Sequence, residues 1–196
     1  QYLYLSAILA VSITMTACGN SVNQNMSSNT SVAAASQLFS ERDLSGEYDA
    51  SKCEQITLSD AGCTSDSSAV AIGQNTVTIT KEGDYIINGS LSDGMVIVDV
   101  EKSEKVQLIL NGVTIHSESS APIYIKKADK VFVTLAEGTE NTLTNGGKFT
   151  AIDDNNIDAV IFSKDDLTLN GTGTLIVQSP SAHGIVSKNE LVVTDG

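Results

Sequence analysis

The stretch Ile161 to Leu167, with the sequence Ile-Phe-Ser-Lys-Asp-Asp-Leu, returns 24 residues later as Ile185 to Leu191, Ile-Val-Ser-Lys-Asn-Glu-Leu. In both copies a short apolar segment runs into Ser-Lys and two polar residues, and a Leu then opens the next apolar segment. Similarity at a fixed spacing of this size is typical of repeat proteins, in which each repeat buries its apolar face against its neighbours.

Apolar triplets extend this pattern toward the N-terminus. They are Tyr85–Ile87, Leu108–Leu110, Val131–Val133, Leu167–Leu169 and Leu191–Val193. The steps between them are 23, 23, 36 and 24 residues, and the long step predicts one repeat with an insertion centred on Gly146 to Ala159. A second set of triplets precedes the last four: Val96–Val98, Ile123–Ile125, Val160–Phe162 and Gly184–Val186.

The composition of these segments predicts strands. They are short, β-branched and alternating, and Asn-Gly, Asp-Gly and Glu-Gly pairs separate them. A repeat of this length is too short for a crossover helix in each unit and too long for simple hairpins. We therefore expect an all-β, right-handed parallel β-helix, because parallel crossovers have this hand. A β-sandwich explains the alternation but not the period. The predicted inward set is Ile87, Leu108, Leu110, Val131, Val133, Leu167, Leu169, Leu191 and Val193, with Thr168 and Val192 facing outward.

The first 18 residues predict a lipoprotein signal peptide. Residues 2–15 form an apolar run of signal-peptide length, shorter than a comfortable span of the ~30 Å hydrocarbon core. Residues 15–19 resemble a bacterial lipobox, which predicts lipid attachment at Cys18, export, and a membrane-anchored lipoprotein on the bacterial cell surface. The alternative is a secretory peptide in which Cys18 is incidental.

The remaining chain divides into two parts. Residues 19–37 are rich in Ser and Asn and predict a disordered tether, and residues 38–196 predict the β-helix domain. The sequence begins at Gln1 without a basic segment and stops at Gly196 without a polar cap. We therefore expect the β-helix to be truncated at both ends of this sequence and to continue beyond its C-terminus.

The charge balance excludes one class of partner. Asp and Glu number 24 against 11 Lys and Arg, which gives a net charge of −13. Nucleic-acid binding needs clustered cations and is excluded. Two His and three Cys without a C-x-x-C pair leave little for a zinc site.

Four segments together carry a resemblance to a known group. They are Phe39–Leu44, Val106–Val113, Val131–Asn141 and Ser163–Leu167. At these residues the chain resembles bacterial exported proteins called carbohydrate-binding domain-containing proteins, from about Phe39 to Gly196. The resemblance implies a right-handed parallel β-helix, calcium sites, affinity for acidic polysaccharide such as polygalacturonate, and a shape like that of pectate lyases.

The densest charge lies in and after the predicted insertion. Calcium takes oxygen ligands, which short Asp and Asn side chains supply. The candidate calcium ligands are Asp153, Asp154, Asn156, Asp158, Asp165 and Asp166. The spacing approaches an EF-hand loop, but Ala159 stands at the glycine position and Asp165 replaces the bidentate Glu. A solvated acidic loop is the alternative.

Lys164 and Lys188 stand one repeat apart, each directly after a strand segment, so we expect them to stack along one edge. They are the candidate carbohydrate-binding cations, because they could meet carboxylates of a uronic-acid chain. Solvated edge lysines that discourage strand pairing are the alternative.

Cys53 and Cys63 lie ten residues apart in a chain predicted to be exported. Export permits a disulfide between them, and two unpaired buried thiols are the alternative.

Three functions fit these observations. The first is calcium-dependent binding of acidic polysaccharide by a lipid-anchored surface protein without catalytic residues. The second is a polysaccharide lyase, in which Lys164 would be the base that abstracts the proton next to a uronate carboxyl group. The third is a structural stalk or adhesin without a glycan partner.

Overall fold

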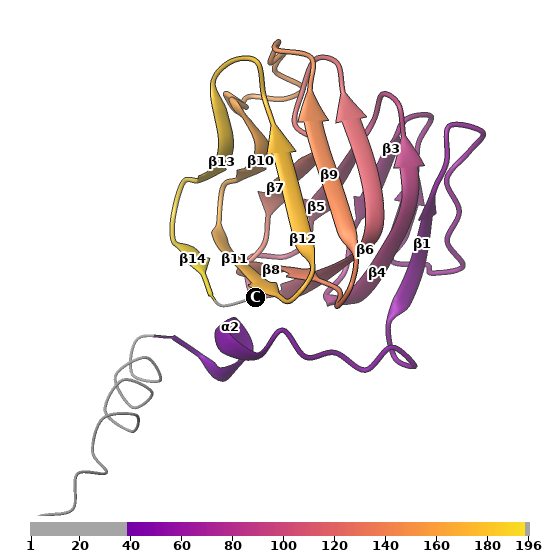
Figure 1. The fold of residues 1–196 in the computed structure, drawn as a ribbon, viewed down its shortest axis with the longest axis vertical. Coiled ribbons are helices and arrows are strands. Elements are labelled where there is room, and N and C mark those ends of the chain that lie inside the picture. Colours follow the sequence, from indigo (N-terminus) through magenta and orange to yellow (C-terminus); the bar gives the residue numbers. More distant parts are fainter. Residues whose placement is uncertain (1–38, 195–196) are drawn as a thin grey trace, which may run out of the picture. The chain divides into compact units, whose positions relative to one another are not determined.

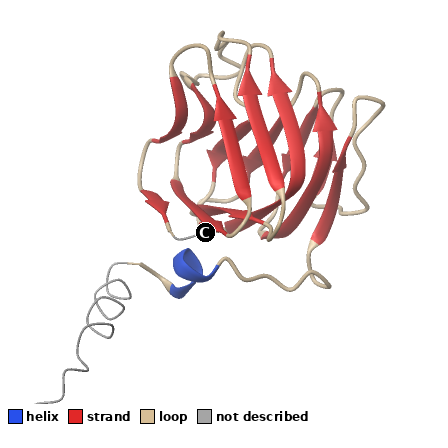
Figure 2. Cartoon of the chain, viewed as in Figure 1, coloured by secondary structure: helices blue, strands red, loops and turns tan. Residues whose placement is uncertain are grey.

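The computed structural model describes residues 39–194. Apart from one short helix, α2 (Glu41–Ser45), this part of the chain is built from strands (Figures 1 and 2). The strands are β1 (Glu54–Leu58), β2 (Val70–Ile72), β3 (Thr76–Ile79), β4 (Gly83–Leu91), β5 (Met95–Asp99), β6 (Lys105–Ser117), β7 (Ile123–Lys127), β8 (Lys130–Leu135), β9 (Glu140–Asn145), β10 (Ala159–Ser163), β11 (Asp166–Gly171), β12 (Thr174–Gln178), β13 (His183–Ser187) and β14 (Leu191–Val193).

The strands form two sheets between which the chain alternates. The larger sheet contains β1-β4-β6-β8-β11-β14 in this order, and β9 and β12 continue it beside the second half of β6. The smaller sheet has the order β13-β10-β7-β5-β3-β2. All pairings are parallel except that of β2 with β3. The predicted all-β class and parallel pairing are therefore confirmed, while the right-handed β-helix stays a prediction.

The strand register follows the sequence repeat, with one correction. Tyr85 pairs with Leu108, and Leu167 pairs with Leu191, as the spacing predicts. The predicted step of 23 residues from Leu108 to Val131 is wrong, because Val131 pairs with Val106. The error is two residues, one full period of side-chain alternation in a strand, so the predicted inward side chains still face the core.

Seven of the nine predicted inward side chains lie in the core, and two do not. Leu191 and Val193 are 45% and 69% exposed, because β14 is the last strand of its sheet in residues 39–194. Their direction is as predicted, since they pair with Leu167 and Leu169. Thr168 faces outward as predicted, yet it is fully buried because α2 covers it.

The Asn-Gly pairs lie where the chain leaves a straight strand. Gly89 and Gly112 have φ of +92° and +75° and sit at a register shift between β4 and β6. Gly171 ends β11 with φ of +89°. A Cβ atom on Gly89 would lie 2.2 Å from the carbonyl oxygen of Leu58 on the neighbouring strand. Glycine is required there both by its backbone conformation and by the close approach of the next strand.

The insertion between β9 and β10 covers the outer face of the smaller sheet. Phe149 and Ile157 pack against Tyr124 of β7 and Phe162 of β10, so both rings are buried. No helix in the described part of the chain is long enough to cross a membrane. The predicted signal peptide, Cys18 and the tether lie outside the described residues.

Candidate functional site

A polar segment lies across the outer face of the larger sheet. We call residues Ser40–Glu47, which include α2, the strap. A reciprocal capping box begins α2: the Ser40 hydroxyl accepts from the backbone N–H of Asp43, and the Asp43 carboxylate accepts from the backbone N–H of Ser40. Gly46 ends the helix with φ of +60°, and a Cβ atom at this position would lie 3.0 Å from the backbone nitrogen of Gly171 at the end of β11. The strap is therefore a defined element and not an irregular arm.

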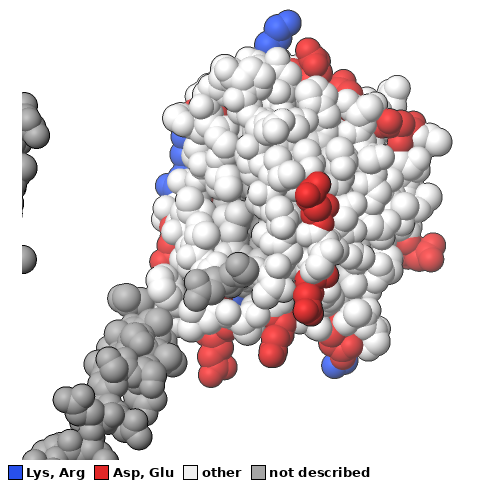
Figure 3. Space-filling view, viewed as in Figure 1, with Lys and Arg blue, Asp and Glu red and all other residues white. Residues whose placement is uncertain are grey.

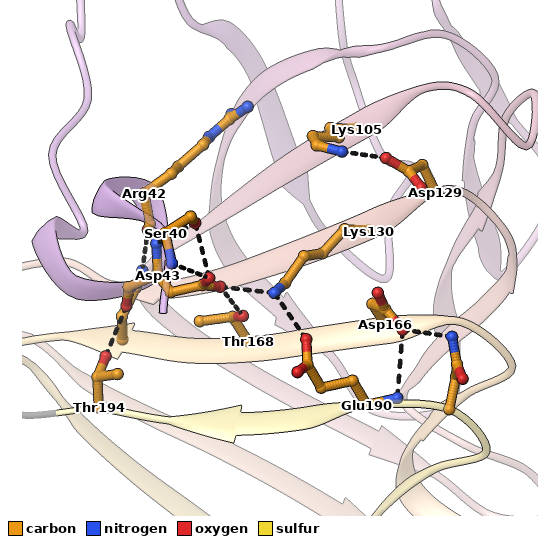
Figure 4. Close-up of polar contacts among 12 residues, drawn as sticks. Ser40, Arg42, Asp43, Lys105, Asp129, Lys130, Asp166, Thr168, Glu190 and Thr194 are labelled. Carbon is orange, nitrogen blue, oxygen red and sulfur yellow. Dashed lines mark hydrogen bonds and ion pairs between the residues drawn. The ribbon is translucent and has the colours of Figure 1, made fainter. Parts of the chain in front are cut away.

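Asp43 anchors the strap to the sheet (Figure 4). Its Oδ1 lies 2.7 Å from the Lys130 Nζ and accepts a hydrogen bond of 2.5 Å from the Thr168 hydroxyl. Burial opposes ionisation of Asp43, but the hydrogen bonds from Lys130, Ser40 and Thr168 outweigh it and lower its pKa to about 2. Lys130 also pairs with Glu190 at 3.2 Å. The network thus connects the strap with β8, β11 and the turn before β14.

Arg42 holds the other side of the strap. Its guanidinium group donates to Asp84 Oδ1 at 2.6 Å and to Gln107 Oε1 at 3.2 Å. It also lies 4.6 Å from the centroid of the Phe132 ring, a cation–π arrangement. The only arginine of the chain is therefore committed to contacts between the strap and the sheet.

A groove runs along the strap, first over β4 and β6 and then past the ends of β8 and β11. It consists of two adjoining hollows of about 810 and 750 Å³ that share Ser45, Glu47 and Asp84. Glu41, Glu82, Lys105 and Gln107 line the first hollow. Asp49, Lys52, Glu137 and Thr172 line the second. We call this the strap groove. On the face shown in Figure 3, acidic side chains are scattered over the surface and basic ones are few.

The predicted calcium ligands do not form one site. Asp153 and Asp158 precede β10, whereas Asp165 and Asp166 follow it, so an extended strand separates the two pairs. Asp165 pairs with Lys102 and accepts from the backbone N–H of Ala128. Among residues 39–194, no group of three or more His, Cys, Asp or Glu side chains is arranged to hold a metal ion.

Three of the remaining predicted ligands lie within the insertion, where one is hydrogen-bonded to protein groups and two are exposed. Asp153 accepts from the Tyr124 hydroxyl at 2.8 Å and from the backbone N–H of Asn155, while Asp154 and Asn156 are exposed. Burial opposes ionisation of Asp153, but these hydrogen bonds prevail and lower its pKa. Burial raises the pKa of Tyr124, and its hydrogen bond to the Asp153 carboxylate raises it further.

Asp158 differs from the other predicted ligands. Its Oδ1 is buried without a hydrogen-bond partner, and so is the Oγ of Ser120. Ser120 precedes β7 and Asp158 precedes β10, and these strands pair with each other.

Lys164 and Lys188 occupy equivalent positions in successive circuits, as predicted. The backbone N–H of Lys164 donates to Ile125, and that of Lys188 donates to Ser163. Both side chains are exposed, and the Lys188 ammonium group lies 5.2 Å from the centroid of the Phe162 ring. They lie outside the strap groove, because neither lines its hollows.

The predicted disulfide is not formed, and both cysteines are free thiols. Cys53 packs against Ile86 and Ile109 on the outer face of the larger sheet, whereas Cys63 belongs to the main core. The strand β1 between them places the two sulfur atoms on opposite sides of the sheet. Burial raises the pKa of the Cys53 thiol, and the charges of Asp84 and Asp49 raise it further.

Sequence reasoning missed the strap groove. Its residues come from five segments far apart in the chain, and none of them carries a motif by itself. One signal was available. The matching outward positions of successive repeats are occupied by Asp84, Gln107, Phe132 and Thr168. A fully solvated face does not require an aromatic residue, so Phe132 indicates that this face is covered.

A model of the family described as carbohydrate-binding domain-containing protein matches residues 73–196. The chain belongs to this family. The matched residues include β3 to β14, whereas the strap, β1 and β2 precede them.

Two related proteins support this assignment. A carbohydrate-binding domain-containing protein of Acetivibrio thermocellus is 40% identical over 129 residues, which cover 65% of this chain and 45% of that protein. The chain thus spans about half the length of this relative. A solved structure, described as the gadolinium derivative of a polysaccharide lyase-like protein from C. thermocellum, matches with a TM-score of 0.70 and 37% identity. That match covers 74% of this chain and 59% of the solved one.

Proposed function

We propose that this chain binds carbohydrate and that the strap groove is its binding site. The observation that carries the proposal is the groove itself, an open hollow lined by carboxylates, an amide and two cations from the strap, from β4 and β6 and from the turns before these strands, in a chain of the carbohydrate-binding family. Carboxylates and amides can accept and donate several hydrogen bonds, as recognition of sugar hydroxyls requires. The strands β4 and β6 also hold Asp84, Lys105 and Gln107 in fixed positions.

The charge of the groove favours a neutral glycan. The first hollow presents the carboxylates of Glu41, Glu47, Glu82 and Asp84 against two cations. Both cations are already paired, Arg42 with Asp84 and Lys105 with Asp129. A uronic-acid chain would therefore meet net negative charge, whereas hydroxyl groups would find acceptors.

Acidic polysaccharide and calcium, which the family resemblance implies, stay predictions. Among the predicted calcium ligands, Asp158 is the one with a buried oxygen that has no hydrogen-bond partner, and the buried Ser120 hydroxyl also lacks one. Bound calcium would neutralise negative charge in the insertion. We propose for it a role in holding the insertion against β7, distinct from the strap groove. Calcium should then raise the melting temperature of the wild type, and Asp158→Asn should abolish that rise.

We do not extend the proposal to catalysis. A lyase needs a base that is free to accept a proton, and both cations of the first hollow are bound to carboxylates. Lys164, the predicted base, lies outside the strap groove. Carbohydrate binding is thus the function that the described contacts support best.

The test is a titration of the whole chain with soluble polysaccharides. A neutral β-glucan and polygalacturonate are compared, each with calcium and with a chelator. Ser103→Trp places a bulky ring in the groove from an exposed position, and Ser119→Trp is the matched control at an exposed turn outside it. We expect the neutral glycan to bind the wild type and the control, and Ser103→Trp to weaken binding on the order of tenfold. Equal binding by both variants would reject this site. Calcium-dependent retention of polygalacturonate alone would reject the neutral class.

A further inference from the structure

The strap is held to the sheet by polar contacts. Its helix buries a charged side chain and exposes an apolar one, which is the reverse of the usual arrangement. α2 buries Asp43, which is 3% exposed, and leaves its only large apolar side chain, Leu44, 39% exposed. Surface helices normally bury their apolar side and expose their charges. Burial of apolar surface by the helix itself therefore does not account for the docking of the strap.

The contacts beneath the strap are hydrogen bonds to side chains of the sheet (Figure 4). Asn170 donates to the carbonyl of Arg42 at 3.0 Å, and Thr194 donates to the carbonyl of Asp43 at 2.7 Å. Gln107 donates to the carbonyl of Glu47 at 3.3 Å. Each of these sheet groups offers a donor that a sugar hydroxyl could accept in place of the strap backbone.

The same face carries an aromatic ring. Phe132 of β8 is 1% exposed, and the planar guanidinium group of Arg42 lies over it. A hydrogen-bonded row borders the ring: Gln107 donates to Thr134 at 2.9 Å, and Thr134 donates to Asn170 at 2.7 Å. An aromatic face flanked by amides and hydroxyls can bind an amphipathic ligand such as a pyranose ring, which has an apolar face and polar edges.

The surface beneath the strap lies within the residues matched by the family model, and the strap lies before them. Gln107, Phe132, Thr134 and Asn170 all lie within the residues matched by the family model, which begins at residue 73. The strap lies before that boundary. The surface is thus part of the matched family domain, and the strap, which precedes the matched residues, covers it.

We infer that Phe132, Gln107, Thr134 and Asn170 form a covered extension of the strap groove, and that the strap is its exchangeable occupant. The ligand class is a neutral polysaccharide, and the inference rests on the proposed function of the groove. A glycan that extends from the groove onto this surface replaces the polar contacts of the strap and places a sugar ring where the Arg42 guanidinium group lies. The strap therefore competes with the ligand, and the apparent affinity is lower than that of the uncovered surface.

The decisive variant weakens the attachment of the strap, whose other residues Glu41, Arg42 and Glu47 line the groove. Asp43→Ala removes the ion pair with Lys130 and the hydrogen bond with Thr168, and Asp43 does not line either hollow. Leu44→Ala is the matched control on the same helix, because Leu44 is exposed. We expect Asp43→Ala to bind the neutral β-glucan on the order of tenfold more tightly than wild type, and Leu44→Ala to bind like wild type.

A double variant identifies the surface. Adding Phe132→Leu to Asp43→Ala keeps an apolar side chain but removes the aromatic face, and should return the affinity to the wild-type value or below. Melting temperatures and circular dichroism verify that each variant is folded, and hydrogen exchange of β8 verifies that Asp43→Ala uncovers the sheet.

The outcomes separate the two proposals. If the wild type binds glycan and Asp43→Ala binds with unchanged affinity, the extension is rejected while the groove stands. A lower affinity of Asp43→Ala also rejects the extension and shows that the strap is needed as a wall of the groove. If neither the wild type nor Asp43→Ala binds glycan, the proposed function itself fails. A gain in affinity that survives Phe132→Leu would place the ligand elsewhere and would overturn the inference.

Discussion

Asp43 and Lys130 form a buried ion pair of 2.7 Å between the strap and β8, in which the two charges come from elements that share no sequence repeat. Such a pair contributes little if it is replaced as a whole, but removal of one partner leaves the other charge buried without compensation. The pair therefore fixes where the strap docks more than it stabilises the sheet.

Acid should release the strap. The pKa of Asp43 falls from an ordinary value of 3.8 to about 2 in the folded protein, so its stabilising effect is complete above pH 4 and is lost as the pH falls toward 2. The effect amounts to about 2 kcal/mol. Asp43→Asn should remove this part of the pH dependence of unfolding, whereas Asp154→Asn, at an exposed position, should not. Identical pH profiles for wild type and Asp43→Asn would contradict the assignment.

The core register predicts a paired result in β11 and β14. Leu169 is 6% exposed and Val193, its register partner, is 69% exposed. Leu169→Asp should abolish cooperative unfolding, because it buries a charge without a partner. Val193→Asp should fold with a melting temperature within a few degrees of wild type. Circular dichroism and protease resistance provide the measurement, and a folded Leu169→Asp protein would disprove the register.

The glycines of two Asn-Gly pairs, Gly89 and Gly112, should respond differently to substitution by Ala. Gly89→Ala combines a positive φ with a contact of 2.2 Å to the Leu58 carbonyl oxygen, while Gly112→Ala has the same kind of φ and open space. We expect Gly112→Ala to cost roughly 1 kcal/mol, and Gly89→Ala to cost more than that, since the next strand must move. Chemical denaturation of both variants measures the difference, and equal losses would show that backbone conformation alone matters.

The cysteines should behave as separate thiols. Without reductant, native protein should be alkylated slowly at Cys53, whose raised pKa disfavours the thiolate, and Cys63 should react only after unfolding because it is buried in the core. Peptide mapping by mass spectrometry distinguishes the two sites. Recovery of a peptide that links Cys53 to Cys63 would restore the disulfide that the sequence suggests.

Membrane anchoring through Cys18 stays a prediction from the sequence. If Cys18 carries a diacylglycerol group, the full-length protein should fractionate with membranes and Cys18→Ala should move to the soluble fraction. Wild-type amounts of intact Cys18→Ala protein in the membrane fraction would refute the lipoprotein assignment.

The all-β class and the parallel pairing were predictable because the repeat occurs several times in the sequence. The matching heptapeptides fix the pairing of Leu167 with Leu191, and alternation fixes which side chains face inward even where the step was misjudged by two residues at Val131. The exposure of Leu191 and Val193 was not predictable, because it depends on whether another strand pairs with β14.

The candidate site was much less accessible from sequence. Asp158 and Asp165 are close in sequence, but β10 between them is extended, so nearness along the chain did not become nearness in space. Asp43, Lys130 and Thr168 show the opposite case, because they meet only after the strap crosses the sheet. The composition of each segment by itself does not indicate such a contact.

The dozen or so residues added between β9 and β10 leave Val131 in register with Leu167 and Ile123 in register with Ile161. Each bend between strands can thus lengthen without disturbing the stack on either side. A chain of this design can change its surface at one bend at a time while its interior remains the same. New recognition surfaces can arise here by loop growth alone, a route that is closed to folds whose loops and cores are interlocked.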